Sequence, residues 1–211
     1  MARRPPTKPR KAAIQARSRA TVDALVEATA RILVRDGFDK ASTNRIAEVA
    51  GVSVGSLYQY FPGKEALVAA VMERHQQEIM QEVQGRLPEL FALPVEQAMR
   101  ELVAVAVKAH RVDPALHRVL AEQIPQAGKP PERETFDRGN FLLFRTYLER
   151  HRDELRVRDL DLATFVCVTS IEALTHNAVL HYSAVLSGQA TEALVEEGTR
   201  LVTGYLKGVA P

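Results

Sequence analysis

The 211-residue chain is predicted to be all-α, with about nine helices. Apolar residues recur at helical spacing along most of its length, and no segment shows the sustained alternation of a β-strand. Glycine and proline residues separate these stretches, as expected for helices joined by short loops. A third observation is more specific: within residues 42–61, two short helices are separated by a single glycine turn.

The chain begins with a basic segment, residues 1–16, that we expect to be a disordered arm. Pro5, Pro6 and Pro9 disfavour a helix there, and no acidic residue precedes Asp23. Such an arm can follow the phosphates of DNA or enter its minor groove, and the alternatives are a solubilising tail or a nuclear-targeting signal. The first helix is expected at about residues 17–35.

The next two helices follow from local capping signals. Ser42 and Ser53 each stand where a side-chain oxygen can accept a hydrogen bond from the first turn of a helix. Gly51 stands between them, where a helix end favours a positive φ. Residues 54–61 then form about two turns of a second helix.

The second helix has distinct inner and outer faces. Leu57 and Phe61, with the preceding Val52, are suited to pack inward. The outer side is left with Val54, Gly55, Ser56, Tyr58 and Tyr60. In a helix-turn-helix unit the second helix enters the major groove, so this pattern predicts binding to double-stranded DNA.

The residues of this unit resemble those of the TetR/AcrR family. The similarity rests on the run Gly51-Val52-Ser53, the run Leu57-Tyr58-Gln59-Tyr60-Phe61 and the following Lys64-Glu65-Ala66-Leu67, and covers roughly residues 18–72. For residues 75–211 the resemblance is only to the family's general architecture. Taken over the whole chain, the resemblance to this family implies an N-terminal three-helix helix-turn-helix DNA-binding domain. It also implies a C-terminal helical domain for ligand binding and dimerisation.

The resemblance also implies DNA-contact positions. In the first helix of the helix-turn-helix these positions contact phosphate and at times a base. In its second helix they contact bases or phosphates. A lysine at the start of the next helix meets an anion where the helix dipole favours one. The candidate DNA-binding residues are Thr43, Asn44, Arg45, Ser53, Val54, Gly55, Ser56, Tyr58, Tyr60 and Lys64. Gly63 stands where this family usually has a helix-capping residue such as Asn or Ser. The alternatives are core packing for the tyrosines and Val54, and a solvated charge for Arg45.

Charge supports a DNA-binding N-terminal part. Residues 1–64 hold 12 Lys or Arg and five Asp or Glu, a net charge of +7. Residues 65–211 hold 16 and 21, a net charge of −5. The positive field is thus concentrated where the helix-turn-helix lies.

Six further helices are expected, at about residues 65–84, 94–110, 113–123, 132–155, 159–186 and 191–209. We expect the first of them to end near Gly85 and Pro88. The predicted domains are the arm at 1–16, the DNA-binding domain at 17–64 and the regulatory domain at 65–211.

The last two long helices carry more apolar surface than a lone bundle edge requires. We expect them to form a two-fold four-helix interface between two copies of the chain, and the alternative is a purely intramolecular core. The candidate interface residues are Phe165, Thr169, Ala173, Leu201, Gly204 and Tyr205.

The central helices are expected to bind an unknown small-molecule effector. Its candidate contacts are Phe91, Met99, His110, Phe141, Phe144, Tyr147, Glu172 and His176, for each of which core packing is the alternative. Glu172 and His176 have the i, i+4 spacing of metal-binding faces, but no second histidine completes an H-E-x-x-H pattern, so no metal or cofactor is expected.

These patterns favour a sequence-specific transcriptional regulator and not an enzyme. The expected form is a homodimeric repressor that a ligand releases from a palindromic operator, and a non-specific DNA-binding or scaffolding protein is the alternative. The single cysteine, Cys167, is expected to be a core thiol, and a redox sensor is the alternative. No signal peptide or membrane span is expected, which fits a cytoplasmic protein.

Overall fold

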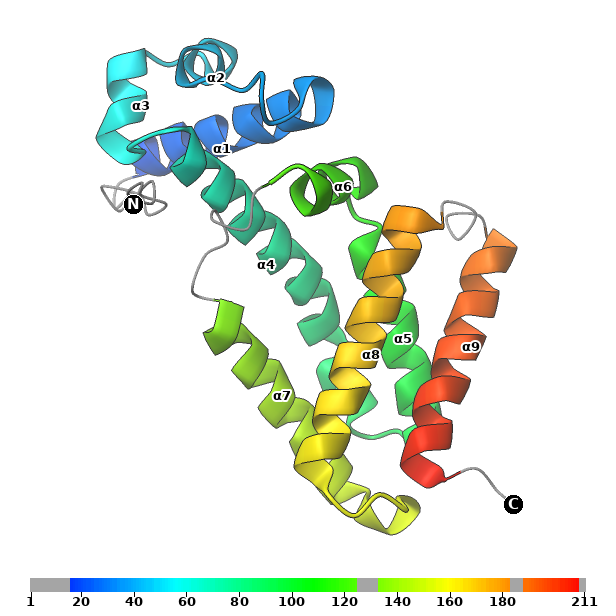
Figure 1. The fold of residues 1–211 in the computed structure, drawn as a ribbon. Coiled ribbons are helices and arrows are strands. Elements are labelled where there is room, and N and C mark those ends of the chain that lie inside the picture. The colour runs from blue at the N-terminus through cyan, green and yellow to red at the C-terminus, as the bar shows by residue number, and fades with distance from the viewer. Residues whose placement is uncertain (1–15, 125–132, 183–187, 209–211) are drawn as a thin grey trace, which may run out of the picture. The chain divides into compact units, whose positions relative to one another are not determined.

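A computed structural model describes residues 16–124, 133–182 and 188–208 (Figure 1). Within these residues the chain forms nine α-helices and a short 3-10 helix, with no β-strand, so the predicted all-α class is confirmed. The proposed basic arm lies outside the described residues except for Ala16. The helices are α1 (Ala16–Asp36), α2 (Thr43–Ala50), α3 (Val54–Tyr60), α4 (Lys64–Leu90), α5 (Val95–His110), α6 (Pro114–Glu122), α7 (Arg133–Arg150), η2 (Arg152–Glu154), α8 (Leu160–His181) and α9 (Gly188–Lys207).

The described chain divides into two compact units. The first contains residues 16–77 and 115–124, and the second contains residues 78–114, 133–182 and 188–208. Helix α4 is continuous across the division. The first unit therefore takes in α6 and the N-terminal half of α4 besides the three helices of the predicted DNA-binding domain.

The core of the first unit is built by α1, α2, α3, α4 and α6. Its fully buried side chains include Leu25 and Leu33 of α1, Ile46 of α2, Leu57 of α3 and Leu67 of α4. Since α2 and α3 are short, most of their stability comes from burying these side chains and not from helix propensity.

The second unit packs α5 against α8 and α9, with α7 alongside α8 (Figure 1). The N-terminus of α5 has no side-chain cap of its own, because Pro94 occupies the cap position. Glu154 of η2 supplies one instead, since its carboxylate accepts a hydrogen bond from the Val95 N–H at 3.2 Å.

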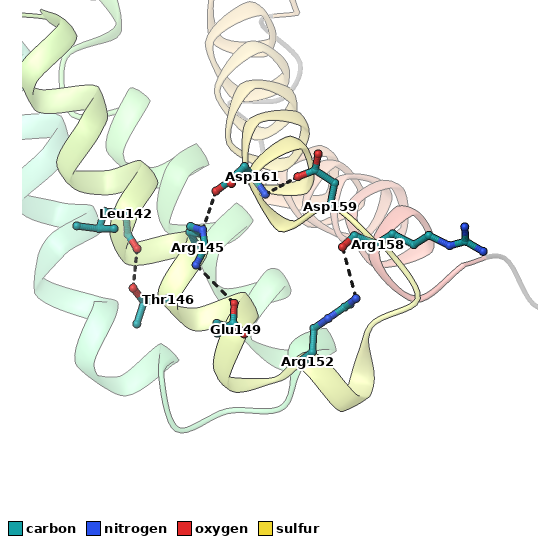
Figure 2. Close-up of polar contacts among 8 residues, drawn as sticks. All are labelled: Leu142, Arg145, Thr146, Glu149, Arg152, Arg158, Asp159 and Asp161. Carbon is teal, nitrogen blue, oxygen red and sulfur yellow. Dashed lines mark hydrogen bonds and ion pairs between the residues drawn. The ribbon is translucent and has the colours of Figure 1, made fainter.

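The start of α8 is fixed by a cap and an ion pair (Figure 2). The Asp159 carboxylate accepts hydrogen bonds from the N–H groups of Asp161 and Leu162, each at 3.0 Å. Arg145 of α7 donates to the Asp161 carboxylate at 2.6 Å and also contacts Glu149 at 3.5 Å. These bonds tie α7 to α8 at the end where α8 begins.

Several predicted helix boundaries were wrong. Helix α4 does not break near Gly85 and Pro88 but continues to Leu90. Pro88 has no N–H to donate to the preceding turn, yet the helix continues for two residues beyond it. The helix predicted at 132–155 ends at Arg150 and is followed by η2. The described α8 ends at His181, and residues 183–187 of its predicted span lie outside the described part.

One described helix, α8, has the length and composition of a membrane span. Leu160, Ala163, Cys167 and Ile171 of this helix are buried in the core of the second unit. Part of the apolar character of α8 is therefore explained by its place in that core.

Candidate DNA-binding site

The helix-turn-helix is held by the local signals that the sequence predicts. Ser42 accepts a hydrogen bond from the Arg45 N–H at 3.3 Å, and Ser53 accepts one from the Ser56 N–H at 3.1 Å. Gly51 has a φ of 69°, a left-handed conformation that favours glycine. Its N–H bonds to the Glu48 carbonyl at 3.1 Å, and the following N–H of Val52 bonds to Ala47 at 3.0 Å.

Helix α3 presents a mixed surface. Leu57 and Phe61 are buried as predicted, and Val52 packs against the core while remaining partly exposed. Val54 and Tyr60 were expected on the outer face, but both pack partly against the core. A side chain at position 55 would meet only the Ser53 hydroxyl, at 3.9 Å, so Gly55 leaves the helix surface open to a close approach.

A hydroxyl pair joins α2 to α3. The Thr43 and Tyr58 oxygens lie 3.1 Å apart, within hydrogen-bond distance. The Tyr58 side chain is 41% exposed, so it is not an aromatic core residue. Two of the predicted contact residues are therefore positioned by one another.

Arg45 lies beside an acidic residue that the sequence reasoning did not single out. Its guanidinium forms an ion pair with Asp36 at 3.2 Å, and Arg35 contacts the same carboxylate at 2.9 Å. The Arg35 hydrogen bond, opposed in part by desolvation and aided by the charge of Arg45, holds the Asp36 pKa below its usual value. The carboxylate is thus ionised and offsets part of the positive charge of this surface.

Lys64 begins α4 and contacts the loop that follows α1. Its ammonium donates to the Phe38 carbonyl at 3.1 Å and lies 4.0 Å from the centre of the Phe38 ring. The Phe38 N–H in turn donates to the Gln123 side chain at 3.2 Å. No local pattern could have revealed the Gln123 contact, because 85 residues separate the partners.

A second contact between segments distant in the sequence joins His75 and His117, whose ring nitrogens lie 3.1 Å apart within the first unit.

The predicted effector residues fall into two groups in the second unit. Phe91, Phe144 and Tyr147 are neighbours, with ring centres 5.8 Å apart for Phe91–Tyr147 and 6.4 Å apart for Phe144–Tyr147. The Tyr147 hydroxyl donates to the Leu93 carbonyl at 2.9 Å, and burial raises its pKa. Met99 is buried in the same core, and Phe141 is partly exposed on α7.

The second group contains His110 of α5 with Glu172 and His176 of α8. The His110 and His176 rings are nearly perpendicular, with centres 6.0 Å apart. The Glu172 carboxylate lies near enough to act electrostatically on the His110 ring. The structure thus brings together three of the eight candidate contacts from two helices.

The candidate interface residues of α8 and α9 lie on the surface of the chain. Phe165 and Leu201 are 59% and 58% exposed, and Tyr205, Thr169 and Ala173 are also exposed. The opposite sides of the same helices are buried. A side chain at Gly204 would meet no atom within 4 Å.

These features together define a helix-turn-helix protein with a separate helical unit. The family model for "Bacterial regulatory proteins, tetR family" matches residues 25–71, and that for "Tetracyclin repressor-like, C-terminal domain" matches residues 94–206. The chain belongs to the TetR family and is a DNA-binding transcriptional regulator, not an enzyme.

The curated relatives match this chain over only part of their own length. The uncharacterised HTH-type transcriptional regulator YvdT of Bacillus subtilis is 33% identical over 63 residues, which are 30% of this chain and 32% of YvdT. The nucleoid occlusion factor SlmA of Actinobacillus pleuropneumoniae is 45% identical over 42 residues, 20% of this chain and 21% of SlmA. The chain thus spans about a third or less of these two proteins.

Solved structures share the fold over nearly the whole chain. The fatty acid degradation regulator FadR from Bacillus halodurans has a TM-score of 0.67 and 20% identity, over 90% of this chain and 96% of FadR. A TetR-family regulator from Mesorhizobium loti has a TM-score of 0.68 and 19% identity, over 89% and 97%. FadR from Bacillus subtilis, solved in complex with stearoyl-CoA, has a TM-score of 0.64 and 17% identity, over 87% and 98%.

Proposed function

We propose that this regulator is a cytoplasmic homodimeric repressor that binds a palindromic operator and is released from it by a small molecule. The observation that carries the proposal is the exposed apolar surface of α8 and α9. Large apolar side chains that stand out together on neighbouring helices usually mark an interaction site, and α8 packs against α9 in the second unit. The exposed members are Leu162, Phe165, Leu201 and Tyr205.

A two-fold dimer would place two helix-turn-helix units on one operator. One recognition helix reads only a few base pairs, and two related by symmetry read a palindrome with greater affinity and discrimination. In this proposal α3 enters the major groove, the Thr43–Tyr58 pair and Lys64 contact phosphates, and Asn44, Arg45, Ser53, Val54, Gly55, Ser56 and Tyr60 contribute further contacts.

The proposed ligand response rests on the buried groups of the second unit. Its core combines aromatic and aliphatic side chains, and the polar residue His110 is buried in the same unit. The stearoyl-CoA complex of Bacillus subtilis FadR supports the idea that a fold of this kind can hold a small molecule. To release DNA, the effector must bind one conformation of the dimer more tightly than the other.

The DNA part of the proposal is tested by selecting bound duplexes from a random pool at near-physiological salt. A recovered palindrome is the expected result. Enrichment of a single non-repeated half-site would contradict the dimer, and a folded protein that enriches no motif would contradict sequence-specific binding by the ligand-free chain.

The dimer is tested with Leu201→Glu. Leu201 would be buried at the dimer interface in each copy. Losing that burial costs about 1.5–3 kcal/mol per copy, which weakens a two-fold dimer by roughly 10²- to 10⁴-fold. Sedimentation should show monomers at micromolar concentration. Val112→Glu is the matched control, because Val112 is 51% exposed but lies outside α8 and α9. Equal sedimentation of wild type and Leu201→Glu as dimers would exclude this interface.

A further inference from the structure

The loop between α1 and α2 is held by two distant segments of the first unit, and both contact Phe38. The Phe38 carbonyl accepts a hydrogen bond from the Lys64 ammonium at 3.1 Å, and the same ammonium lies 4.0 Å from the centre of the Phe38 ring. The Phe38 N–H donates to the Gln123 side chain at 3.2 Å. Gln123 therefore fixes the residue that holds Lys64.

The amide of Gln123 can make this contact in only one orientation. A backbone N–H can only donate, so the atom that faces it is the amide oxygen. The same oxygen lies close to the backbone of Gly37, because a Cβ built at position 37 would lie 2.9 Å from it. Gly37 has a φ of 82°, a left-handed conformation that other residues rarely adopt. A glycine at this position thus permits the close approach of the loop to Gln123.

The core of the first unit sets the position of Gln123. The residue follows the end of α6, and its N–H bonds to the Val119 carbonyl at 2.9 Å, which continues the helical backbone by one residue. Leu120 and Ile124 on either side of it are buried in the core, whereas Gln123 is exposed. Its side chain can therefore be changed without removing a core residue.

We propose that Gln123 is a positioning residue for DNA binding, which fixes the backbone of Phe38 and through it the Lys64 ammonium. This inference rests on the phosphate contact of Lys64 in the proposed function. A lysine ammonium stands on a flexible four-carbon chain, and ordering such a chain on binding costs affinity. A carbonyl that is itself held in place orders the ammonium before DNA arrives.

Two other roles for Gln123 lead to different results. If Gln123 contacted DNA itself, its contribution would be independent of Lys64. If it only stabilised the loop, its loss would lower the melting temperature and leave the DNA affinity of the folded chain unchanged. A positioning residue instead loses its effect once the group that it positions has been removed.

The test measures binding of the full chain to a fluorescein-labelled duplex of arbitrary sequence at low salt, by fluorescence anisotropy. A phosphate contact does not depend on base sequence, so the operator is not needed. Gln123→Met keeps the length of the side chain and removes the amide oxygen. It should weaken binding by about 2- to 12-fold per recognition unit, the equivalent of one hydrogen bond.

The second variant is Lys64→Met, which keeps an unbranched side chain beside the Phe38 ring and removes the charge. It should weaken binding at least as much as Gln123→Met. The double variant should bind no more weakly than Lys64→Met alone, because no ammonium is left for Gln123 to position.

Gln123→Glu is the conservative variant, because a carboxylate oxygen can still accept from the Phe38 N–H. It should bind better than Gln123→Met once the effect of its negative charge is subtracted. Glu122→Gln measures that effect, since Glu122 is the exposed neighbour of Gln123 and the change removes one charge.

Unchanged affinity of Gln123→Met beside weaker binding by Lys64→Met would overturn this inference and leave the Lys64 contact standing. Fully additive losses in the double variant would also overturn it and would make Gln123 a separate DNA contact. So would a charge-corrected Gln123→Glu that binds no better than Gln123→Met. Unchanged affinity of Lys64→Met would overturn the Lys64 contact of the proposed function and the positioning role with it.

Discussion

Two glycines of α9, Gly198 and Gly204, provide a matched test of how closely the helices of the second unit pack. A methyl group at position 198 would lie 3.0 Å from both a Leu174 and a Val103 carbon, whereas one at position 204 would meet nothing within 4 Å. In both positions Ala gains about 1 kcal/mol of helix propensity over Gly. At position 198 this gain competes with an overpacking cost of about 1–3 kcal/mol.

The expected result is opposite for the two variants. Gly204→Ala should stabilise the folded chain by up to about 1 kcal/mol, raising the melting temperature by about 2–4 °C for a protein of this size. Gly198→Ala should be neutral or destabilising by up to about 2 kcal/mol. Thermal unfolding followed by circular dichroism, repeated at several protein concentrations, measures both and separates folding from association. A Gly198→Ala melting temperature as high as that of Gly204→Ala would refute the close approach of α9 to α5 and α8.

Three other outcomes are expected from the described contacts. Removing the Tyr58 hydroxyl with Tyr58→Phe should weaken operator binding by about 5- to 150-fold, from about 0.5–1.5 kcal/mol per hydrogen bond in each of two copies, and fluorescence anisotropy showing unchanged affinity would exclude the contact. Asp36→Asn should strengthen DNA binding by up to about fivefold per recognition unit, because it removes the carboxylate that pairs with Arg45, and a weaker complex would contradict this. Cys167 should resist iodoacetamide at pH 8.5 until the protein unfolds, because burial raises its pKa to about 12. The neutral thiol favours the folded state below the ordinary pKa of about 9 and loses that effect as pH rises toward 12, so rapid native alkylation would contradict the burial.

The helix-turn-helix could be predicted closely because its signals are local. Ser42, Gly51 and Ser53 act on backbone groups within a few residues of themselves, so a short stretch of sequence contains the whole argument. The same reasoning identified Leu57 and Phe61 as core residues. It placed Val54 and Tyr60 too far outward, because helical spacing alone does not show how far a neighbouring helix covers each side chain.

Contacts between distant segments could not be predicted in this way. Glu154 caps α5 from 59 residues away, and Gln123 bonds to Phe38 from 85 residues away. The pairing of His110 with His176 is of the same kind, since each looks ordinary on its own helix. The continuation of α4 through Pro88 could not be predicted either, because a proline disfavours a helix locally and only the surrounding structure can offset that cost.

The polar groups of the proposed DNA contact are already hydrogen-bonded within the first unit, and this affects how they can contribute to affinity. The Thr43–Tyr58 pair has two hydroxyl protons, and its mutual bond uses one, so the other remains for a phosphate oxygen. The Lys64 ammonium has three N–H groups, and its bond to Phe38 uses one. A phosphate can therefore add to these internal bonds without replacing them.

Because the side chains are held in place before binding, part of the ordering cost, about 0.5–1.5 kcal/mol for each flexible side chain, is already met by folding. Arg45 differs, since its partner Asp36 is itself an anion that a nearby phosphate would repel. In the proposed complex the hydroxyl pair and Lys64 would therefore favour binding directly, whereas the contribution of Arg45 would be reduced by the carboxylate beside it.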